Sequence, residues 1–293
     1  MDLSIIMINY NTKQLTQRAV FSVFACRPAL KFEIIVVDNS EDPAERYSDF
    51  RPGVTVLGGI KNRGFGNACN VGARRASGKY LLFLNPDTLM HPGTLEESVG
   101  YLSSHPQAGA LGVRTLLRDG TLDHACKRGF PTPSAAFYYF TGLDRIRPAS
   151  RKFGAYRATY LNEKAVGEVD SVAGSFLMMP KDVFFMLHGF DEAFFMYGED
   201  LDLCFRLKQL GYRVVYDGKV SITHLKGQSG LHTRSKTVAF HFYNAMKLFY
   251  RKHYQASYPA VVNAAVFCAI ELKYRAALAK IERCGIRKNP GPS

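Results

Sequence analysis

Short apolar runs alternate with amphipathic stretches over the first hundred residues of the chain. Each run ends abruptly at polar residues and is too short for a typical helix, which is typical of buried parallel strands. The stretches between the runs carry capping residues or glycines at their ends, which predicts helices. We expect strands at 3–8, 32–37, 54–57 and 80–84, and helices at 13–25, at 64–76 and from near Pro92. Such alternation predicts right-handed βαβ units and an α/β fold with a mostly parallel central sheet.

The second half of the chain is less regular. Residues 130–162 are rich in proline, arginine and aromatic residues without a clear period, which predicts a long mobile loop. Residues 198–211 give the clearest helical pattern, with leucines on one face, charged residues on another and glycine at the end. Further strands are expected at 169–179, 212–216 and 220–223, a basic helix at 236–253 and a final amphipathic helix at 259–283.

The composition is that of a globular protein large enough for a full core, with 293 residues, 47% of them apolar and 22% charged. The six cysteines are scattered without a CxxC pair, which argues against a zinc cluster or disulfide framework and favours a reducing compartment. No signal peptide is expected, because the chain runs directly into a predicted strand. The longest weakly polar run, 259–270, is too short to span a bilayer.

The net charge of +13 is high and unevenly distributed. Residues 234–293 hold 11 Lys or Arg and 2 Asp or Glu, and so contribute +9. A basic tail suggests an anionic partner: nucleic acid, phospholipid head groups or phosphorylated substrates. We therefore divide the chain into a main domain, 1–233, and a basic helical extension, 234–293. In the extension a cationic cluster lies among aromatic residues, and the last helix could pack on the domain or lie on an anionic membrane surface. The cluster consists of Lys247, Arg251, Lys252 and His253.

Polar side chains follow three of the predicted strands. Asn9 to Asn11 follow the first strand, Asp38 follows the second, and Asn85-Pro86-Asp87 follows the strand at 80–84. Ligands of open α/β sheets bind at the carboxyl ends of the strands, so Asp87 is a candidate for holding a metal or a phosphate-bound metal. The alternative is structural: Asp87 or Thr88 would cap the helix that follows.

The segment from Asn62 to Asn70 contains Gly64-Phe65-Gly66 but lacks the third glycine of a dinucleotide fingerprint, so we reject an NAD-binding site. Its small residues could still let the backbone approach a nucleotide.

Three carboxylates fall within four residues at Glu199, Asp200 and Asp202. Acids in a first turn favour the helix dipole, and Asp202 could pair with Arg206 one turn later, but three exceed what capping requires.

Taken in order, these segments resemble the inverting glycosyltransferases of family 2, which have the GT-A fold. More narrowly, they resemble the bacterial rhamnosyltransferases that build O-antigen and cell-wall polysaccharides. The resemblance extends from Leu3 to His253. The segments that carry it are 37–40, 62–72, 78–87, 189–192 and 197–202, followed by His224, Gly227 and Ser229.

The resemblance implies a donor site. Asp38 would bind the pyrimidine ring, with Asn9, Tyr10 and Asn11 lining the base and ribose. Asn85 to Asp87 takes the place of the family's D-x-D motif, which holds a divalent cation, Mg²⁺ or Mn²⁺, on the diphosphate. His224 matches a metal-ligating histidine of some relatives. Because the amide of Asn85 is a poor ligand for a hard cation, we expect Asp87 to carry most of the metal contact, firmly only with donor bound. Further donor-binding candidates are Asn62, Gly66, Asn70 and Arg234.

The resemblance also implies the acceptor side. Asp200 would be the base that removes the proton of the acceptor hydroxyl, with Glu199 and Asp202 in support. Acceptor-binding residues are expected at Gly174, Ser175, Asp191 and Glu192.

The expected donor is dTDP-L-rhamnose, and the expected acceptor is a lipid-linked saccharide at the inner face of the cytoplasmic membrane. There the protein would be peripheral, held through its C-terminal helices; a homodimer is left open. A second interpretation is a relative that uses UDP-galactofuranose or a UDP-hexose. A non-enzymatic alternative is a nucleic-acid-binding module, because the chain has a high positive charge. The resemblance, however, implies no nucleic-acid partner.

Overall fold

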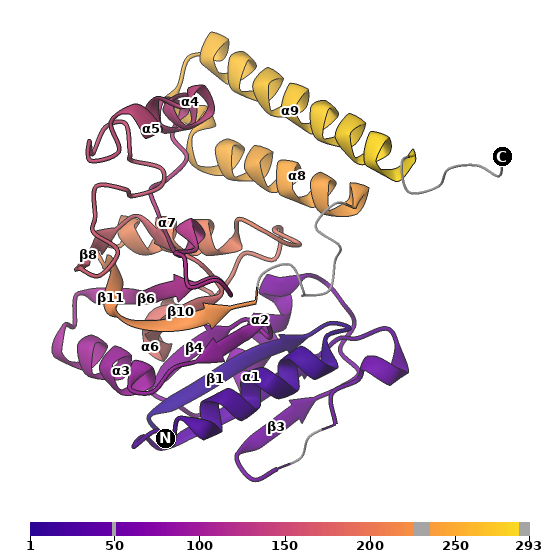
Figure 1. The fold of residues 1–293 in the computed structure, drawn as a ribbon, viewed down its shortest axis with the longest axis vertical. Helices are drawn as coiled ribbons and strands as arrows, with labels where there is room; N and C mark the ends of the chain where they lie inside the picture. Colours follow the sequence, from indigo (N-terminus) through magenta and orange to yellow (C-terminus); the bar gives the residue numbers. More distant parts are fainter. Residues whose placement is uncertain (49–50, 226–234, 287–293) are drawn as a thin grey trace.

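A β-sheet runs through the centre of the protein with helices on both faces (Figure 1). The computed structural model describes residues 1–48, 51–225 and 235–286. Over these residues the strand order is β3-β2-β1-β4-β10-β6-β11-β5, with β8 beside β11. Strands β1 to β4 and the pair β6 and β11 are parallel, whereas β10 is antiparallel to both β4 and β6. The predicted α/β fold with a mostly parallel sheet is therefore confirmed.

The elements of the first half lie within about two residues of their predicted bounds. The first residue after the turn at 85–87, however, begins strand β5, so neither Asp87 nor Thr88 caps a helix and that alternative is wrong. Helix α3 instead begins after Gly93, which has a left-handed φ of 78°. The elements are β1 (Leu3–Asn9), α1 (Lys13–Ala25), β2 (Phe32–Asp38), η1 (Pro43–Glu45), β3 (Val54–Leu57), α2 (Phe65–Arg75), β4 (Tyr80–Leu84), β5 (Thr88–Met90) and α3 (Thr94–Ser104).

The second half departs from its prediction in three places. A strand at 108–116 was not predicted. Residues 130–162, predicted to be a loop, contain helices α4 and α5. The two strands predicted at 212–216 and 220–223 are one strand, β11, with an irregularity between Asp217 and Ser221. The elements are β6 (Ala108–Leu116), η2 (His124–Cys126), β7 (Lys127–Arg128), α4 (Pro133–Thr141), α5 (Leu143–Ile146), β8 (Val166–Val169), β9 (Ser171–Val172), β10 (Phe176–Pro180), α6 (Lys181–Met186), α7 (Glu199–Gln209), β11 (Arg213–His224), α8 (Lys236–His253), η3 (Gln255–Ser257) and α9 (Ala260–Ile286).

The core has two parts because successive side chains of a strand point to opposite faces of the sheet. Ile5 of β1 and Leu82 of β4 pack with α1 and α3 on one face. Ile6 and Phe83 pack with α2, α6 and α7 on the other. These buried faces fix the register of the parallel strands, and with it the level at which their carboxyl ends stop.

The C-terminal extension folds back as a helical hairpin in which α9 packs on α8 (Figure 1). The Tyr250 hydroxyl donates to Asn263 across the hairpin, and Lys247 pairs with Glu271 at 2.8 Å. Lys252 and His253 likewise contact carboxylates of the main domain, so the two lysines of the predicted cationic cluster on α8 are paired with carboxylates within the protein. Among the described helices, none combines the length and apolarity needed to cross a membrane.

Candidate active site

The carboxyl ends of β1 and β2 form a polar edge that holds Asp38. The pairing of the two parallel strands places Asn9 beside Asp38. The Asp38 carboxylate is buried and accepts hydrogen bonds from Asn9 Nδ2 at 3.2 Å and from the backbone N–H groups of Ser40 and Tyr47. Asn11, which has a left-handed φ of 53°, donates its backbone N–H to Ser40 Oγ. Asp38 is thus fixed in orientation by its own strand end and the neighbouring turn.

Of the remaining predicted donor residues on α2 and the turn before it, only Asn62 reaches this edge. Asn62 Oδ1 lies 3.5 Å from the Asn39 amide and accepts from the Gly64 N–H. A Cβ placed on Gly66 would lie 3.1 Å from Phe190 Cβ, so this glycine permits close packing of the segment before α7. Asn70 bonds both the N–H and the carbonyl of Phe190, so its amide also supports that segment.

The Asp87 carboxylate lies at the carboxyl end of β4 and faces the end of β11. Strand pairing sets Thr88 beside His224, and this brings His224 Nε2 to 3.1 Å from Asp87 Oδ1. On the other side of the imidazole, Nδ1 lies 3.3 Å from Asp123 Oδ2. Burial lowers the pKa of His224, but the hydrogen bonds to Asp123 and Asp87 outweigh it and raise that pKa to about 9.

The second oxygen of this carboxylate fits a cation. Asp87 is 1% exposed, and its Oδ2 is buried without a hydrogen-bond partner among the described residues. A buried, unpartnered carboxylate oxygen is costly unless a cation or donor satisfies it. Within residues 1–48, 51–225 and 235–286, no three His, Cys, Asp or Glu side chains are grouped to hold a metal by themselves. Asp87 and His224 can supply two ligands to such a cation.

The acidic turn at the start of α7 faces the same edge through the turn that precedes β10. Asp200 Oδ2 accepts from the Gly174 N–H at 3.1 Å and from Arg128 Nη2 at 2.5 Å, and Oδ1 accepts from the Leu201 N–H. The next residue, Ser175, accepts through its carbonyl from the Asn85 N–H at 3.2 Å. Two hydrogen bonds on adjacent residues therefore join the Asn85–Asp87 turn to Asp200.

Glu199 and Asp202 have opposite electrostatic environments. Glu199 is buried, its Oε2 has no partner in the described part of the chain, and burial, followed by the negative charge of Asp200, raises its pKa to about 8. Burial also acts to raise the pKa of Asp202, but hydrogen bonds from His253, Arg206 and Lys252 lower it to about 2. Glu199 is consequently protonated near neutral pH, whereas Asp202 is a carboxylate.

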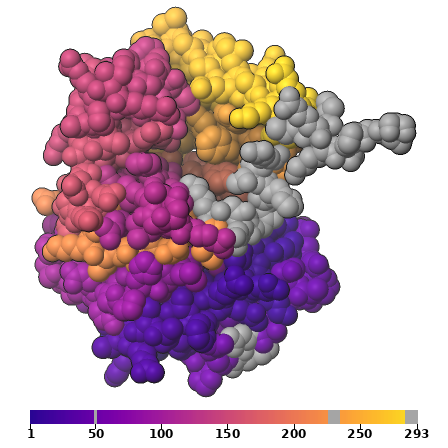
Figure 2. All heavy atoms as spheres, in the orientation of Figure 1, coloured from indigo at the N-terminus to yellow at the C-terminus, as the bar shows by residue number. Residues whose placement is uncertain are grey.

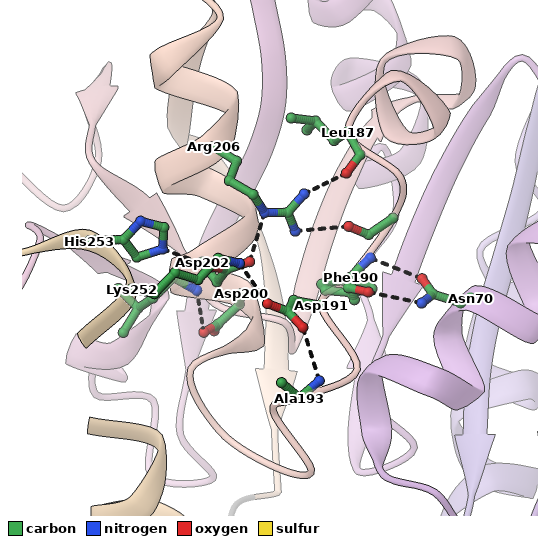
Figure 3. A network of polar contacts seen from close by, with 12 residues as sticks. Asn70, Leu187, Phe190, Asp191, Ala193, Asp200, Asp202, Arg206, Lys252 and His253 are labelled. Atoms are coloured by element: carbon green, nitrogen blue, oxygen red, sulfur yellow. Dashed lines mark hydrogen bonds and ion pairs between the residues drawn. The ribbon is translucent and has the colours of Figure 1, made fainter. Parts of the chain in front are cut away.

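Asp202 belongs to an ion cluster that holds the segment before α7 (Figure 3). Its carboxylate is fully buried and lies 2.7 Å from Arg206 Nε, Lys252 Nζ and His253 Nε2. Arg206 also donates to the carbonyls of Leu187 and Gly189. Asp202 therefore points to the α8 side of α7, away from the contacts made by Asp200.

Two of the predicted acceptor residues lie in this same segment, which we call the clamped segment, 187–195. Asp191 accepts from Lys252 Nζ at 2.6 Å, and Glu192 accepts from the amides of Asn67 and Asn70 (Figure 3 shows Asp191 and Asn70). These amides lower the pKa of Glu192. The other two predicted acceptor residues, Gly174 and Ser175, form the turn beside Asp200.

Comparison with known proteins decides the family. The family model for glycosyl transferase family 2 matches residues 4–166, more than half of the chain. The chain belongs to glycosyl transferase family 2. The resemblance drawn from the sequence is thereby confirmed.

Relatives of this family 2 protein include two named as rhamnosyltransferases and one named as an O-antigen biosynthesis protein. It is 29% identical to the rhamnosyltransferase WbbL of Escherichia coli over 233 residues, which cover 75% of this chain and 83% of that protein. It is 31% identical over 150 residues to an N-acetylglucosaminyl-diphospho-decaprenol L-rhamnosyltransferase of Mycobacterium tuberculosis, covering 51% of this chain and about half of that enzyme. A further relative is the O-antigen biosynthesis protein RfbC of Myxococcus xanthus, 29% identical over 77% of this chain and 17% of RfbC.

Solved structures confirm the GT-A fold. GalNAc-T7 with UDP, GalNAc and Mn²⁺ superposes with a TM-score of 0.58 at 15% identity, over all of this chain and 58% of that one. The mannosyltransferase PcManGT of Pyrobaculum calidifontis, with GDP-Man and Mn²⁺, gives 0.56 at 16% identity over 99% of this chain and 76% of that one.

Two residues of the glycosyltransferase site were missed by the sequence analysis. Arg128, on β7, contacts Asp200 from 72 residues away, and no local pattern indicates that pairing. Asp123 could have been found, because Asp119-Gly120 is a hairpin signal that returns the chain beside the end of β6. Among the predicted residues, Arg234 lies outside the described residues, as do Gly227 and Ser229.

The surface near the site is hollowed in two places. Figure 2 shows a recess between the pink α4–α5 segment and yellow α9, with orange atoms behind it. A separate groove of about 1210 Å³ runs along α1 and reaches Leu89, Thr223 and Leu225, the neighbours of Asp87 and His224. Arg18 and Arg118 also line the groove. The groove thus carries positive charge close to residues that adjoin Asp87 and His224 in the sequence.

Proposed function

We propose that this family 2 glycosyltransferase transfers L-rhamnose from dTDP-L-rhamnose to a hydroxyl of a lipid-linked saccharide, with inversion at the anomeric carbon. The relatives named as rhamnosyltransferases and as an O-antigen biosynthesis protein support the sugar and the pathway class. The observation that carries the proposal is the pair of hydrogen bonds through Gly174 and Ser175. Through them, a carboxylate suited to a donor diphosphate and a carboxylate suited to an acceptor hydroxyl are held in one rigid arrangement.

Asp38 is proposed to bind the pyrimidine base, with Asn9, Tyr10, Asn11 and Asn62 around the base and ribose. Both Asp38 oxygens already accept hydrogen bonds within the chain. A carboxylate has about four acceptor positions, so a ring N–H of thymine or uracil can be added without breaking these bonds. The hydrogen-bond donors within the chain fix the orientation of the carboxylate, so binding the base loses little additional side-chain entropy.

Asp87 and His224 are proposed to hold a divalent cation, Mg²⁺ or Mn²⁺, together with the donor diphosphate. When bound, such a cation neutralises charge on the departing nucleoside diphosphate. The contact that Asp123 makes with His224 Nδ1 fixes the imidazole orientation, as carboxylates commonly do for metal-binding histidines. Because Asn85 carries an amide, Asp87 is the residue of this turn that offers a carboxylate to the cation.

Asp200 is proposed to be the base. Arg128 and the Gly174 N–H orient Oδ2, and the proton of the acceptor hydroxyl moves to the carboxylate as that oxygen attacks the anomeric carbon. The raised pKa of Glu199 favours its protonated form, which can donate a hydrogen bond, so we assign it a supporting role beside Asp200. Asp202 is held by Arg206, Lys252 and His253, so we assign it a positioning role. Asp191 and Glu192 shape the acceptor side through the clamped segment.

The lipid-linked acceptor places the proposed reaction at the inner face of the cytoplasmic membrane, with the protein peripheral to it. In this proposal residues 1–233 carry the chemistry. The extension 234–293 supports it through Lys252 and His253, whose partners lie in the clamped segment and at the start of α7.

A donor screen tests the proposal. The protein is incubated with dTDP-L-rhamnose, UDP-galactofuranose and UDP-hexoses and a lipid-linked acceptor, with and without Mg²⁺ or Mn²⁺. We expect product from dTDP-L-rhamnose with inverted configuration, and none from Asp87→Ala. Turnover only with a UDP-sugar would show that the donor is that sugar nucleotide and not dTDP-L-rhamnose. Failure with every nucleotide sugar, together with salt-sensitive nucleic-acid binding that survives Asp87→Ala, would refute the enzymatic assignment.

A further inference from the structure

Helices α4 and α5 expose large apolar side chains next to α9, at the top of Figure 1. Phe137 is 59% exposed, Phe140 45% and Ile146 72%. Lys273 of α9 lies over the Phe140 ring at 3.8 Å from its centroid, which shows that α4 and α9 adjoin. Exposed aromatic and aliphatic residues that lie close together in one segment are a sign of an interaction surface.

The cations around these residues are exposed, whereas the acids are not available. Arg145, Arg147, Arg151 and Lys152 are all exposed, and Asp144 is the one acidic residue in the sequence between 133 and 152. Asp144 is buried and lies 3.5 Å from Arg157. On α9, Glu271 and Glu282 are paired with Lys247 and Lys236 of α8. The face therefore combines apolar side chains with an excess of positive charge. We call it the docking face: Phe137, Phe140, Ile146, Arg145, Arg147, Arg151, Lys152 and Lys273.

We propose that the docking face binds the head-group region of an anionic bilayer. Apolar side chains set among Lys and Arg enter the acyl boundary while the cations meet lipid phosphates. A second copy of the chain is disfavoured as the occupant, because a twofold contact would bring two equally positive faces together. This assignment shifts the membrane contact from the C-terminal helices, where Lys247 and Lys252 are paired within the protein, to the α4–α5 segment.

The docking face is tied to the proposed base. Arg128 contacts Asp200, and α4 begins five residues later, which spans at most about 18 Å of extended chain. The Gly129 N–H donates to the Tyr156 carbonyl, and Tyr156 packs on Tyr139 of α4. A bilayer against this face would lie on the acceptor side of the site. The lipid-linked nature of the acceptor is taken from the proposed function, and the inference rests on it.

The test uses the absence of tryptophan from the sequence. Phe137→Trp introduces a single fluorophore on the docking face in the full-length protein, and Phe21→Trp introduces one at an equally exposed site on α1, where Phe21 is 64% exposed. Each variant is titrated with vesicles of phosphatidylcholine alone or mixed with phosphatidylglycerol. We expect a blue shift only for Phe137→Trp and only with the anionic vesicles.

Substituting two exposed arginines together provides a second measurement that does not depend on the aromatic sites. Arg145→Gln/Arg147→Gln should weaken vesicle binding by roughly 25-fold, about fivefold for each cation near the surface. Arg18→Gln/Lys31→Gln removes the same charge from exposed positions on α1 and just before β2 and should leave binding within about twofold if only the docking face contacts lipid.

The outcomes separate the alternatives. Equal responses from both tryptophan variants, or equal losses from both charge pairs, would overturn the docking face. So would a dimer in sedimentation in which the fluorophore of Phe137→Trp is already buried without vesicles, since the face would then join two copies. Transfer to an acceptor analogue with a short, water-soluble tail needs no bilayer, so it tests the proposed function separately from vesicle binding.

Discussion

Asp200 and Asp202 lie two residues apart on α7, and substituting each with Asn should have opposite effects. Asp202 is fully buried and paired with Arg206, Lys252 and His253. Its pKa falls from the ordinary 3.8 to about 2, which corresponds to roughly 2 to 3 kcal/mol of folding stability. Asp202→Asn should therefore lower the free energy of unfolding by about that amount at pH 7.

The sign of the pH dependence follows from the direction of the shift. The unfolded chain takes up the proton at a higher pH than the folded protein does. The stabilisation is therefore complete above pH about 4 and is lost as the pH falls from 3.8 toward about 2. The stability difference between wild type and Asp202→Asn should be constant from pH 7 to about 4 and should narrow below it.

Urea unfolding followed by circular dichroism measures these differences, with transfer assayed on the folded fraction. The matched control is Asp182→Asn, an exposed carboxylate at the start of α6, which should change stability by less than about 0.5 kcal/mol. The folded Asp202→Asn variant should retain transfer within a few fold. A variant of wild-type stability that has lost transfer would refute this reasoning and make Asp202 part of the chemistry.

Three further predictions concern the neighbouring carboxylates. Asp200→Asn should lower the transfer rate by about 10²- to 10⁴-fold with nucleotide affinity unchanged; substantial residual turnover would move the base to Glu199. Because the pKa of Glu199 is raised from 4.5 to about 8, the folding stability of the wild type should fall as the pH rises from 4.5 to about 8. Glu199→Gln has no such group and should lose less stability over this range. If the urea midpoints of the two proteins change equally between pH 6 and 9, the prediction is contradicted. Asp123→Asn should weaken Mn²⁺-dependent nucleotide binding by about 10- to 100-fold through His224, measured by calorimetry, and an equal loss without metal would argue against positioning.

The first half of the fold could be predicted because its signals are local. The strands from β1 to β4 are apolar runs that stop at polar turns, and α1 has the predicted bounds, 13–25. The same reasoning failed at α4 because Phe137 and Phe140 are exposed. A helix with aromatic residues on its outer face has no polar stripe, so its hydrophobic pattern lacks the helical period.

The site was predictable in part. Strand ends located Asp38 and Asp87, since parallel strands bring their carboxyl ends to one edge. The partners Asp123 and Arg128 depend on contacts across 101 and 72 residues, which residue spacing alone does not indicate. The charge of the extension was predicted correctly as a total but not as a surface, because Lys247 and Lys252 are paired with carboxylates that folding brings to them.

Strand β10 has a consequence for how such enzymes diversify. Within the described sheet it lies between β4 and β6, so the strands that carry Asp38 and Asp87 meet the rest of the sheet through β10 and through the pairing of β5 with β11. A recombination in the loop after α3 would exchange Asp38 and Asp87 but would leave His224, the contact of Asp87, and the Gly174–Ser175 turn on the other half of the gene. An exchanged half would therefore have to fit both contacts, so we expect substitutions in the two halves to be coupled in evolution.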